Sequence, residues 1–291
     1  MRFRHFILAA GAAAAFALAP AQVAGGQQSS APAAKAAPAA PFSSDRISVV
    51  VQGEGPDVIL IPGLTSPREI WKGTVAAVPG YRYHLVQVNG FAGTKAGANA
   101  SGPVVEPVAH EIARYIQHQK LQKPALIGHS MGGIISMMIA ARQPHLVGKL
   151  MVVDMLPQPA GLFGGSASGL GSLADRLAAT PNGKRLIGAL VGTFGSEAAR
   201  QSDPDVVAQA SHDLARTNLT PELPKIAAPM TVLFASPAAA SPDHARIVQD
   251  YRSAYSGAPK AKLRPIPESG HMIMFHQPAR FRAEVKDFLK S

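Results

Sequence analysis

Residues 124–133 read PALIGHSMGG, and this stretch decides the fold. Its apolar first half predicts a buried strand, and the glycine-flanked serine that follows matches G-x-S-x-G, a sharp strand-to-helix turn. Gly128 and Gly132 suit that turn because a Cβ at either place would collide with neighbouring backbone. The turn would expose Ser130, and the N–H of Met131, at the helix start, would face a developing oxyanion. The pattern predicts a nucleophilic serine; the alternative is a plain turn that contains a serine.

The N-terminus has the pattern of an export signal. Arg2 and Arg4 precede the apolar segment Phe6–Ala19, and Ala19-Pro20-Ala21 fits a small-residue cleavage site. An apolar run of about 14 residues is shorter than the roughly 20 of a membrane helix, although an uncleaved anchor is the alternative. We therefore expect residues 1–21 to be a signal peptide. The mature protein would then be a periplasmic or secreted bacterial protein with no stable membrane span.

The composition excludes several kinds of site. The chain has no cysteine, which excludes disulfides, thiolate metal sites and a cysteine nucleophile. Its net charge is +10, but the lysines and arginines are scattered and no RNA-binding signature is present, so we expect no nucleic-acid partner. The sequence has neither an H-E-x-x-H motif nor a glycine loop in the context of a nucleotide site, so we expect no metal and no cofactor. Nothing in it indicates an oligomeric state.

The chain divides into a linker and one large domain. Residues 22–44 are rich in Ala, Pro, Gln and Ser, which predicts a flexible linker before a domain over residues 45–291. Apolar runs then alternate with helical patterns, as in α/β proteins with a mostly parallel sheet. The turn Gly53–Pro56 is typical of a hairpin. The expected strands are Ile47–Gln52, Asp57–Ile61, Tyr83–Asn89, Ala125–Gly128, Lys149–Val153, Met230–Ala235 and Lys262–Pro265, and the expected helices include Val104–Gln119, Ile134–Arg142 and Phe281–Leu289.

Between about residues 155 and 224 the strand pattern stops. Gly161–Gly171 is rich in Gly and Ser, and helical patterns follow at Leu173–Ala179, Gly183–Val191 and Pro204–Ala215. A helical insertion between two core strands favours a cap over the strand ends. A helical decoration away from the site is the alternative.

A serine needs a base within hydrogen-bond reach to act as a nucleophile, and position selects one of the ten histidines. His271 follows the last expected strand and precedes the closing helix. It also comes after Ser130 in the chain, in the order Ser…acid…His of this architecture. His276, five residues further on, is the alternative base.

Over residues 47–290 the chain resembles the α/β-hydrolase superfamily. The matching segments are Leu60–Leu64 (LIPGL), the turn Gly128–Gly132, and Ser269–His271 followed by Gln277–Phe281. The resemblance implies a sheet of about eight strands with helices on both faces, and a helical cap inserted at about 155–224. It also implies that the loop after the first central strand donates a second amide to the oxyanion, which maps to Leu64.

The acid of the triad stays open between two residues. The superfamily often carries it just after the strand expected here at Met230–Ala235, but no carboxylate follows until Asp243. Asp243 comes after Ser241-Pro242, a pattern typical of an ordinary helix N-terminus. Asp154 follows Leu150–Val153, where some branches carry their acid and where parallel sheets bind ligands. We favour Asp154, with Asp243 as the alternative; a missing or different acid is the third case.

Together these residues predict an exported serine hydrolase. Ser130 would attack an acyl carbonyl, His271 would relay the proton and Asp154 would orient His271, while the amides of Leu64 and Met131 would bind the oxyanion. A small-molecule carboxylic ester is the expected substrate. The alternatives are a cofactor-free haloperoxidase or perhydrolase activity and a non-catalytic binding protein on the same scaffold.

Overall fold

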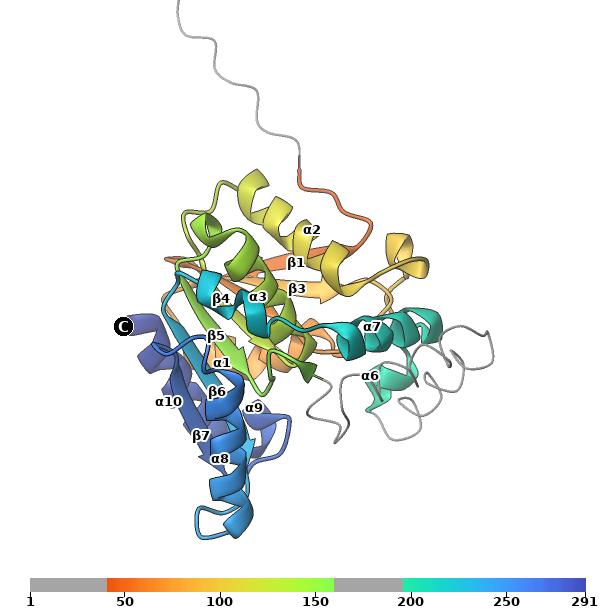
Figure 1. The fold of residues 1–291 in the computed structure, drawn as a ribbon. Coiled ribbons are helices and arrows are strands. Elements are labelled where there is room, and N and C mark those ends of the chain that lie inside the picture. Colours follow the sequence, from red (N-terminus) through yellow and green to blue (C-terminus); the bar gives the residue numbers. More distant parts are fainter. Residues whose placement is uncertain (1–40, 160–195) are drawn as a thin grey trace, which may run out of the picture. The chain divides into compact units, whose positions relative to one another are not determined.

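A seven-stranded sheet forms the centre of the computed structural model, which describes residues 41–159 and 196–291 (Figure 1). The strand order is β1-β3-β2-β4-β5-β6-β7; β1 is antiparallel to β3, and all other neighbours are parallel. The strands are β1 (Ile47–Gln52), β2 (Asp57–Ile61), β3 (Arg82–Val88), β4 (Ala125–His129), β5 (Lys149–Val153), β6 (Met230–Ser236) and β7 (Lys262–Pro267). The predicted mostly parallel α/β sheet is confirmed, and its strands begin and end within two residues of the expected positions.

One expectation about the sheet is wrong, and another is not confirmed. The turn Gly53–Pro56 does not close a hairpin, because β3 lies between β1 and β2, and both edges of β2 are already paired with the parallel strands β3 and β4. The sheet has seven strands within the described residues rather than about eight. The described chain ahead of β1, residues 41–46, is irregular, since Ser44 accepts the N–H groups of Arg46 and Ile47 in place of a strand ladder.

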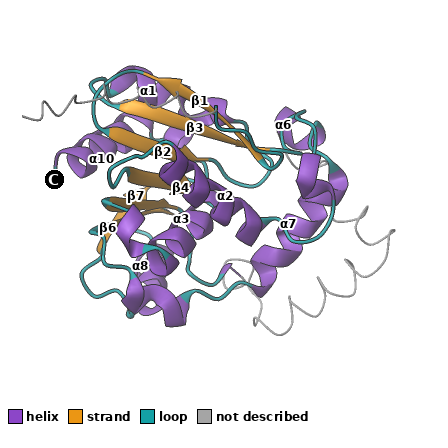
Figure 2. Cartoon of the chain, turned by 90° about the horizontal axis from the view of Figure 1, so that it is seen from above, coloured by secondary structure: helices purple, strands orange, loops and turns teal. Residues whose placement is uncertain are grey.

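Helices cover both faces of the sheet (Figure 2). Successive strand side chains point to opposite faces, so Ile59 and Ile61 of β2 pack in one apolar core while Val58 and Leu60 pack in the other. The first core is closed by α2 (Val105–His118), α3 (Met131–Arg142) and α8 (Pro242–Ala254). The second is closed by η1 (Arg68–Trp71), α1 (Lys72–Ala77), α9 (Ile273–His276) and α10 (Pro278–Lys290).

The predicted signal peptide and nearly all of the predicted linker lie outside the described residues. The last linker residues, ahead of Asp45, already contact the domain. The ring of Phe42 packs edge-on against Tyr115 of α2 with centroids 4.9 Å apart. The guanidinium of Arg114 lies over the same ring, 4.4 Å from its centroid. In the parts of the chain that the structure describes, no helix is both long and apolar enough to span a bilayer.

Of the predicted cap, the structure describes residues 155–159 and 196–224. The helix expected at Pro204–Ala215 is confirmed as α7 (Pro204–Arg216), and the helices expected at Leu173–Ala179 and Gly183–Val191 lie outside the described residues. The described remainder comprises the short helix α6 (Glu197–Arg200) and η5 (Thr220–Lys225).

The helix α7 is attached to the domain by hydrogen bonds at both of its ends. The N–H of Asp203, the residue that caps α7, donates to the carbonyl of Gly90 in the loop after β3. Near the other end, the carboxylate of Asp213 accepts the N–H groups of Val104 and Val105 at 2.6 and 3.1 Å. These groups begin α2 and have no partner within their own helix. The described part of the insertion is therefore fixed to the loop after β3 and to the start of α2.

Candidate active site

Ser130 lies at the turn between β4 and α3, with φ 54° and ψ −121°. A positive φ is costly for a residue with a Cβ, and such conformations collect at functional sites. Two glycines make the turn possible. A Cβ on Gly128 would lie 2.1 Å from the Gly132 carbonyl oxygen, and a Cβ on Gly132 would lie 2.2 Å from the Ile61 carbonyl oxygen. No side chain fits at either position, so the G-x-S-x-G spacing has the steric origin that the sequence predicts.

Asp154 and His271 are hydrogen-bonded side by side at the same edge of the sheet. The Nδ1–H of His271 donates to Oδ2 of Asp154 at 2.7 Å. Asp154 directly follows β5 and is 8% exposed, whereas His271 lies on the loop after β7 with half of its side chain exposed. Because parallel strands bring their carboxyl ends to one edge, β5 and β7 deliver these two residues to the edge that also carries Ser130.

The other carboxylate oxygen of Asp154 is held by two further donors. Oδ1 accepts the main-chain N–H of Ala235 at 2.8 Å and the phenol O–H of Tyr251 at 3.3 Å. Burial, and after it the Asp154 charge, raise the pKa of Tyr251 well above its ordinary value, so the phenol stays protonated and remains a donor. With the histidine included, three donors converge on this one side chain, which fixes the position of both carboxyl oxygens.

The two alternatives that the sequence leaves open lie elsewhere. Asp243 is in the first turn of α8, where Ser241 caps the helix, and its exposed carboxylate pairs with Arg246 at 3.2 Å. His276 accepts the N–H of Gly270 through Nδ1 at 3.0 Å, so it braces the loop that carries His271. Of the candidate acids, the structure brings only Asp154 into contact with His271.

Ser130 and His271 are not hydrogen-bonded to each other in the described residues. They are linked instead through His129, which precedes the serine: its ring centroid lies 4.7 Å from that of His271, and its Nε2–H donates to the His271 carbonyl at 3.0 Å. Hydrogen bonds between a nucleophile and its base are often long in unliganded enzymes and tighten when substrate binds. Among the described residues, His271 is therefore linked to the residue that precedes Ser130 and not to Ser130 itself.

The two candidate oxyanion amides flank the serine. Met131 is the first residue of α3, so its N–H has no acceptor one turn earlier in the helix. Leu64 follows Gly63 in a turn closed by the Ser66 N–H on the Gly63 carbonyl at 3.2 Å. A Cβ on Gly63 would lie 3.0 Å from the Cβ of Ser130, so this turn passes directly against the serine.

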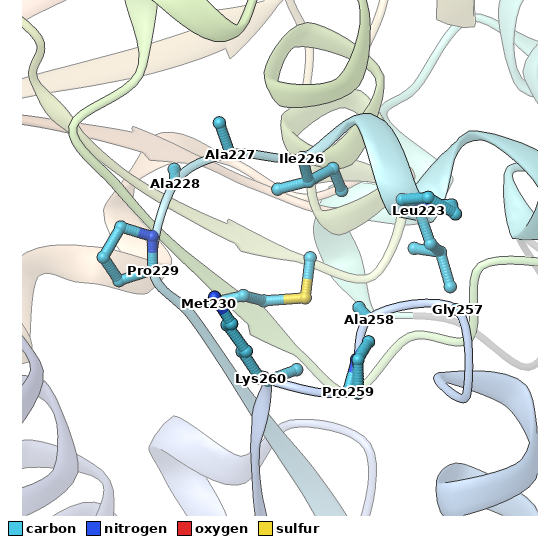
Figure 3. Close-up of a pocket in the computed structure, with 12 residues that line it drawn as sticks. Leu223, Ile226, Ala227, Ala228, Pro229, Met230, Gly257, Ala258, Pro259 and Lys260 are labelled. Carbon is cyan, nitrogen blue, oxygen red and sulfur yellow. The ribbon is translucent and has the colours of Figure 1, made fainter.

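Two pockets lie at opposite ends of the sheet. The first, of about 760 Å³, extends from Asp154 between the start of the insertion and α8. It is lined by apolar side chains such as Leu156 and Ile247 and by the charged pair of residues Arg246 and Asp250. The second, of about 600 Å³, lies where β6 and β7 begin and is shown in Figure 3 with Met230 on its wall. Ligands of parallel sheets bind at the carboxyl ends of the strands, so only the first pocket adjoins the candidate site.

A second histidine–carboxylate pair lies where β2 and β3 begin. The buried His84 contacts Asp57 through Nε2 at 2.8 Å and the Tyr115 hydroxyl through Nδ1 at 2.7 Å. Arg82 also pairs with Asp57 at 2.6 Å, so each member of this network has its partner. Burial lowers the pKa of His84, which keeps the ring neutral. Across residues 41–159 and 196–291, no group of three or more metal-ligating side chains is placed to hold an ion.

Sequence reasoning missed two residues at the site, His129 and Tyr251. His129 occupies the variable position of the turn motif, and Tyr251 lies among the polar residues of α8, so neither carries a local signal. Their contacts span 142 and 97 residues of sequence. Only the fold brings them to His271 and Asp154.

Known proteins resemble the chain in sequence. The sequence profile of the alpha/beta hydrolase family matches residues 58–284. A pimeloyl-[acyl-carrier protein] methyl ester esterase from Vibrio campbellii is 32% identical over 107 residues, which cover 36% of this chain and 39% of that protein. A protein of the same name from Aeromonas salmonicida is 32% identical over 114 residues, 38% and 42% of the two chains. The chain thus spans about two fifths of the length of these curated relatives.

Solved structures share the fold. A thermophilic esterase from Thermogutta terrifontis, with malate bound, superposes with a TM-score of 0.65 and 22% identity, over 84% of this chain and 93% of that chain. A hydrolase from Pseudomonas aeruginosa superposes with a TM-score of 0.64 and 14% identity, over 84% and 94%. At such identities the likeness concerns the fold alone. Joined to the sequence match over residues 58–284, it shows that the chain belongs to the alpha/beta hydrolase family.

Proposed function

We propose that the protein is a serine hydrolase that cleaves carboxylic esters through an acyl-enzyme on Ser130. The observation that carries the proposal is the 2.7 Å hydrogen bond between Asp154 and His271 at the sheet edge that presents Ser130. A carboxylate in this position fixes the tautomer of the histidine with its free Nε2 available, and stabilises the imidazolium that forms when the histidine accepts a proton.

The reaction would proceed in two halves. Ser130 Oγ attacks the acyl carbonyl while His271 Nε2 takes its proton, and the oxyanion is held by the N–H groups of Met131 and Leu64. The carbonyl re-forms as the alcohol leaves with the proton from His271. Water then attacks the acyl-serine with His271 again as base, and the acid leaves as Ser130 recovers its proton.

An ester is favoured as substrate by the names of the relatives. The Vibrio campbellii and Aeromonas salmonicida proteins are described as methyl ester esterases, and the matched segments cover about two fifths of their length. The scaffold hosts many chemistries, so the site rather than the fold must carry the assignment. A neutral serine nucleophile with two amide donors suits acyl transfer to water.

A panel of p-nitrophenyl esters of increasing chain length tests the proposal, with Ser130→Ala as its control. We expect hydrolysis by the wild type and a loss of at least about 10³-fold in kcat on removal of the hydroxyl. A fluorophosphonate probe should label the wild type at Ser130 and leave Ser130→Ala unlabelled. Folded wild-type protein that neither turns over any ester nor reacts with the probe contradicts the proposal and favours the binding-protein alternative.

A further inference from the structure

We propose that His129 is a positioning residue, which anchors the main chain of His271 to the strand that carries the nucleophile. His129 ends β4 and is covalently joined to Ser130, and its Nε2–H donates to the His271 carbonyl at 3.0 Å. One hydrogen bond therefore ties the loop of the base to the turn of the serine. The role concerns the reaction proposed above and rests on it for its kinetic consequences.

His271 needs such an anchor because its own side chain is loosely enclosed. It lies on the loop between β7 and α9, half of its side chain is exposed, and its hydrogen bond to Asp154 holds only one edge of the ring. His129 adds a second restraint from a different direction. The two ring centroids are 4.7 Å apart with the planes inclined by 47°, so the buried ring of His129 supports a face of the exposed one.

The tautomer of His129 follows from its partners. A carbonyl oxygen can only accept, so Nε2 carries the proton in the contact with His271. Nδ1 is buried and has no hydrogen-bond partner among the described residues. It faces the turn after β2, since a Cβ on Gly63 would lie 3.0 Å from it. A lone pair is tolerated there, whereas an N–H pointing at the same place would be a buried donor without an acceptor.

An uncharged His129 ring suits the proposed positioning role. Burial, and after it the charge of His271, lower the pKa of His129 to about 4, while the hydrogen bond to the His271 carbonyl and, after it, the Asp154 carboxylate act in the other direction. His129 thus stays uncharged while His271 gains and loses a proton during turnover. A charged ring at this place would oppose protonation of the base at a centroid distance of 4.7 Å.

Glutamine and asparagine at position 129 separate this role from simple packing. The amide nitrogen of Gln stands as far along the side chain as Nε2 of histidine and can keep the bond to the His271 carbonyl. The amide of Asn stands at the place of Nδ1, facing Gly63, and cannot reach it. His129→Phe keeps a ring of similar volume without any donor.

The kcat values of the three variants should depend on whether each variant keeps the hydrogen bond to the His271 carbonyl. A reacting group displaced by about 1 Å costs up to about 10²-fold in rate, so we expect His129→Phe and His129→Asn to lower kcat by about 10- to 100-fold. KM should stay near the wild-type value, because His129 touches no substrate. His129→Gln should recover most of kcat. The control is His84→Phe, the same change at a buried histidine at the other end of the sheet, which should lower stability and leave kcat unchanged.

A readout independent of turnover completes the test. The Nδ1 proton of His271 in its bond to Asp154 should give a low-field ¹H resonance, which we expect to be sharp in the wild type and in His129→Gln and broadened in His129→Phe. Equal kcat for the Gln and Asn variants, or a wild-type kcat and resonance in His129→Phe, would overturn the proposal. If His129→Phe does not fold, the Gln and Asn pair decides. If the wild type hydrolyses no ester, the resonance still tests His129 while the proposed function fails separately.

Discussion

Asp154 and His271 are 117 residues apart in sequence and 2.7 Å apart in the fold. The acid of this pair follows β5, one strand nearer the nucleophile than β6, after which the chain carries no nearby carboxylate. β6 contributes to the pair differently: its Ala235 N–H holds the other oxygen of Asp154 at 2.8 Å. The end of β6 thus contributes a main-chain donor to the acid, and the acid itself reaches the histidine from the neighbouring strand β5.

Replacing Asp154 by Asn should abolish most of the activity and leave the fold intact. The amide is similar in shape to the carboxylate, but it cannot stabilise an imidazolium and allows the wrong tautomer of His271, so we expect kcat to fall by about 10⁴-fold. Asp243→Asn is the matched control, because its exposed carboxylate pairs with Arg246 one turn further along α8. Steady-state kinetics of both variants decide the point. Full activity in Asp154→Asn together with a loss in Asp243→Asn would reverse the assignment of the acid.

The parts of the molecule that follow from local patterns could be predicted. The turn at Ser130 rests on close approaches by Gly128 and Gly132, and the strands rest on apolar runs, so each is encoded within a few residues. The pairing of strands is encoded differently. Gly53–Pro56 looks like a hairpin turn locally, but β3 enters between its two strands from 20 or more residues away.

The acid and its supporting residues depend on those long-range pairings. Asp154 and Asp243 were both reasonable on local grounds, and they separate only once β5, β6 and β7 are placed side by side. His129 and Tyr251 have no signature at all, because a buried imidazole or phenol is recognised by its partner rather than by its neighbours in sequence. The sequence alone therefore selects Ser130 and His271 as candidates, whereas the choice between the candidate acids depends on the fold.

The Tyr251 hydroxyl should contribute modestly to catalysis through Asp154. Tyr251→Phe removes one of three donors to the carboxylate, and a hydrogen bond worth about 1 kcal/mol corresponds to about a fivefold loss in kcat. Tyr255→Phe, at the C-terminal cap of the same helix, is the matched control, since its buried hydroxyl donates to the Met155 carbonyl and not to the acid. Both variants should lose some stability in thermal unfolding, but only Tyr251→Phe should lower kcat. An equal effect of the two on kcat would assign Tyr251 to packing alone.

A methyl group on Gly128 should be among the most destabilising single changes in the domain. It would lie 2.1 Å from the Gly132 carbonyl oxygen and 2.4 Å from the Ser136 hydroxyl. The main chain at Gly132 can relieve this clash only if the whole turn shifts. Strain of this kind costs about 3 kcal/mol or more in the free energy of unfolding. Gly73→Ala in α1 serves as the control, because its new methyl meets only the flexible end of Arg282 at 3.1 Å and replaces a poor helix former. Urea denaturation of both variants measures the difference, and comparable stabilities would show that the turn can relax.

The domain should lose stability as the pH falls below about 6.5, because burial in the folded state disfavours the charged form of two histidines. Burial lowers the pKa of His84, and it lowers that of His129 to about 4, against an unfolded value near 6.5. Between these values the unfolded chain binds a proton at position 129 that the folded chain does not, so the stabilisation is complete above 6.5 and is lost towards pH 4. The difference between the folded and unfolded pKa values of His129 alone corresponds to roughly 3 kcal/mol in the free energy of unfolding.

His129→Gln separates the contribution of His129 from that of the other titrating groups. Glutamine keeps a donor for the His271 carbonyl and has no proton to gain, so the variant should lose less stability than the wild type between pH 7 and 4.5. Thermal unfolding at the two pH values gives the comparison, with His145→Gln as the control because that residue is exposed between α3 and β5. If both variants lose stability as steeply as the wild type, His129 does not hold a depressed pKa in the folded protein. A flatter profile in His129→Gln alone identifies the buried neutral ring beside the base as a source of the acid lability.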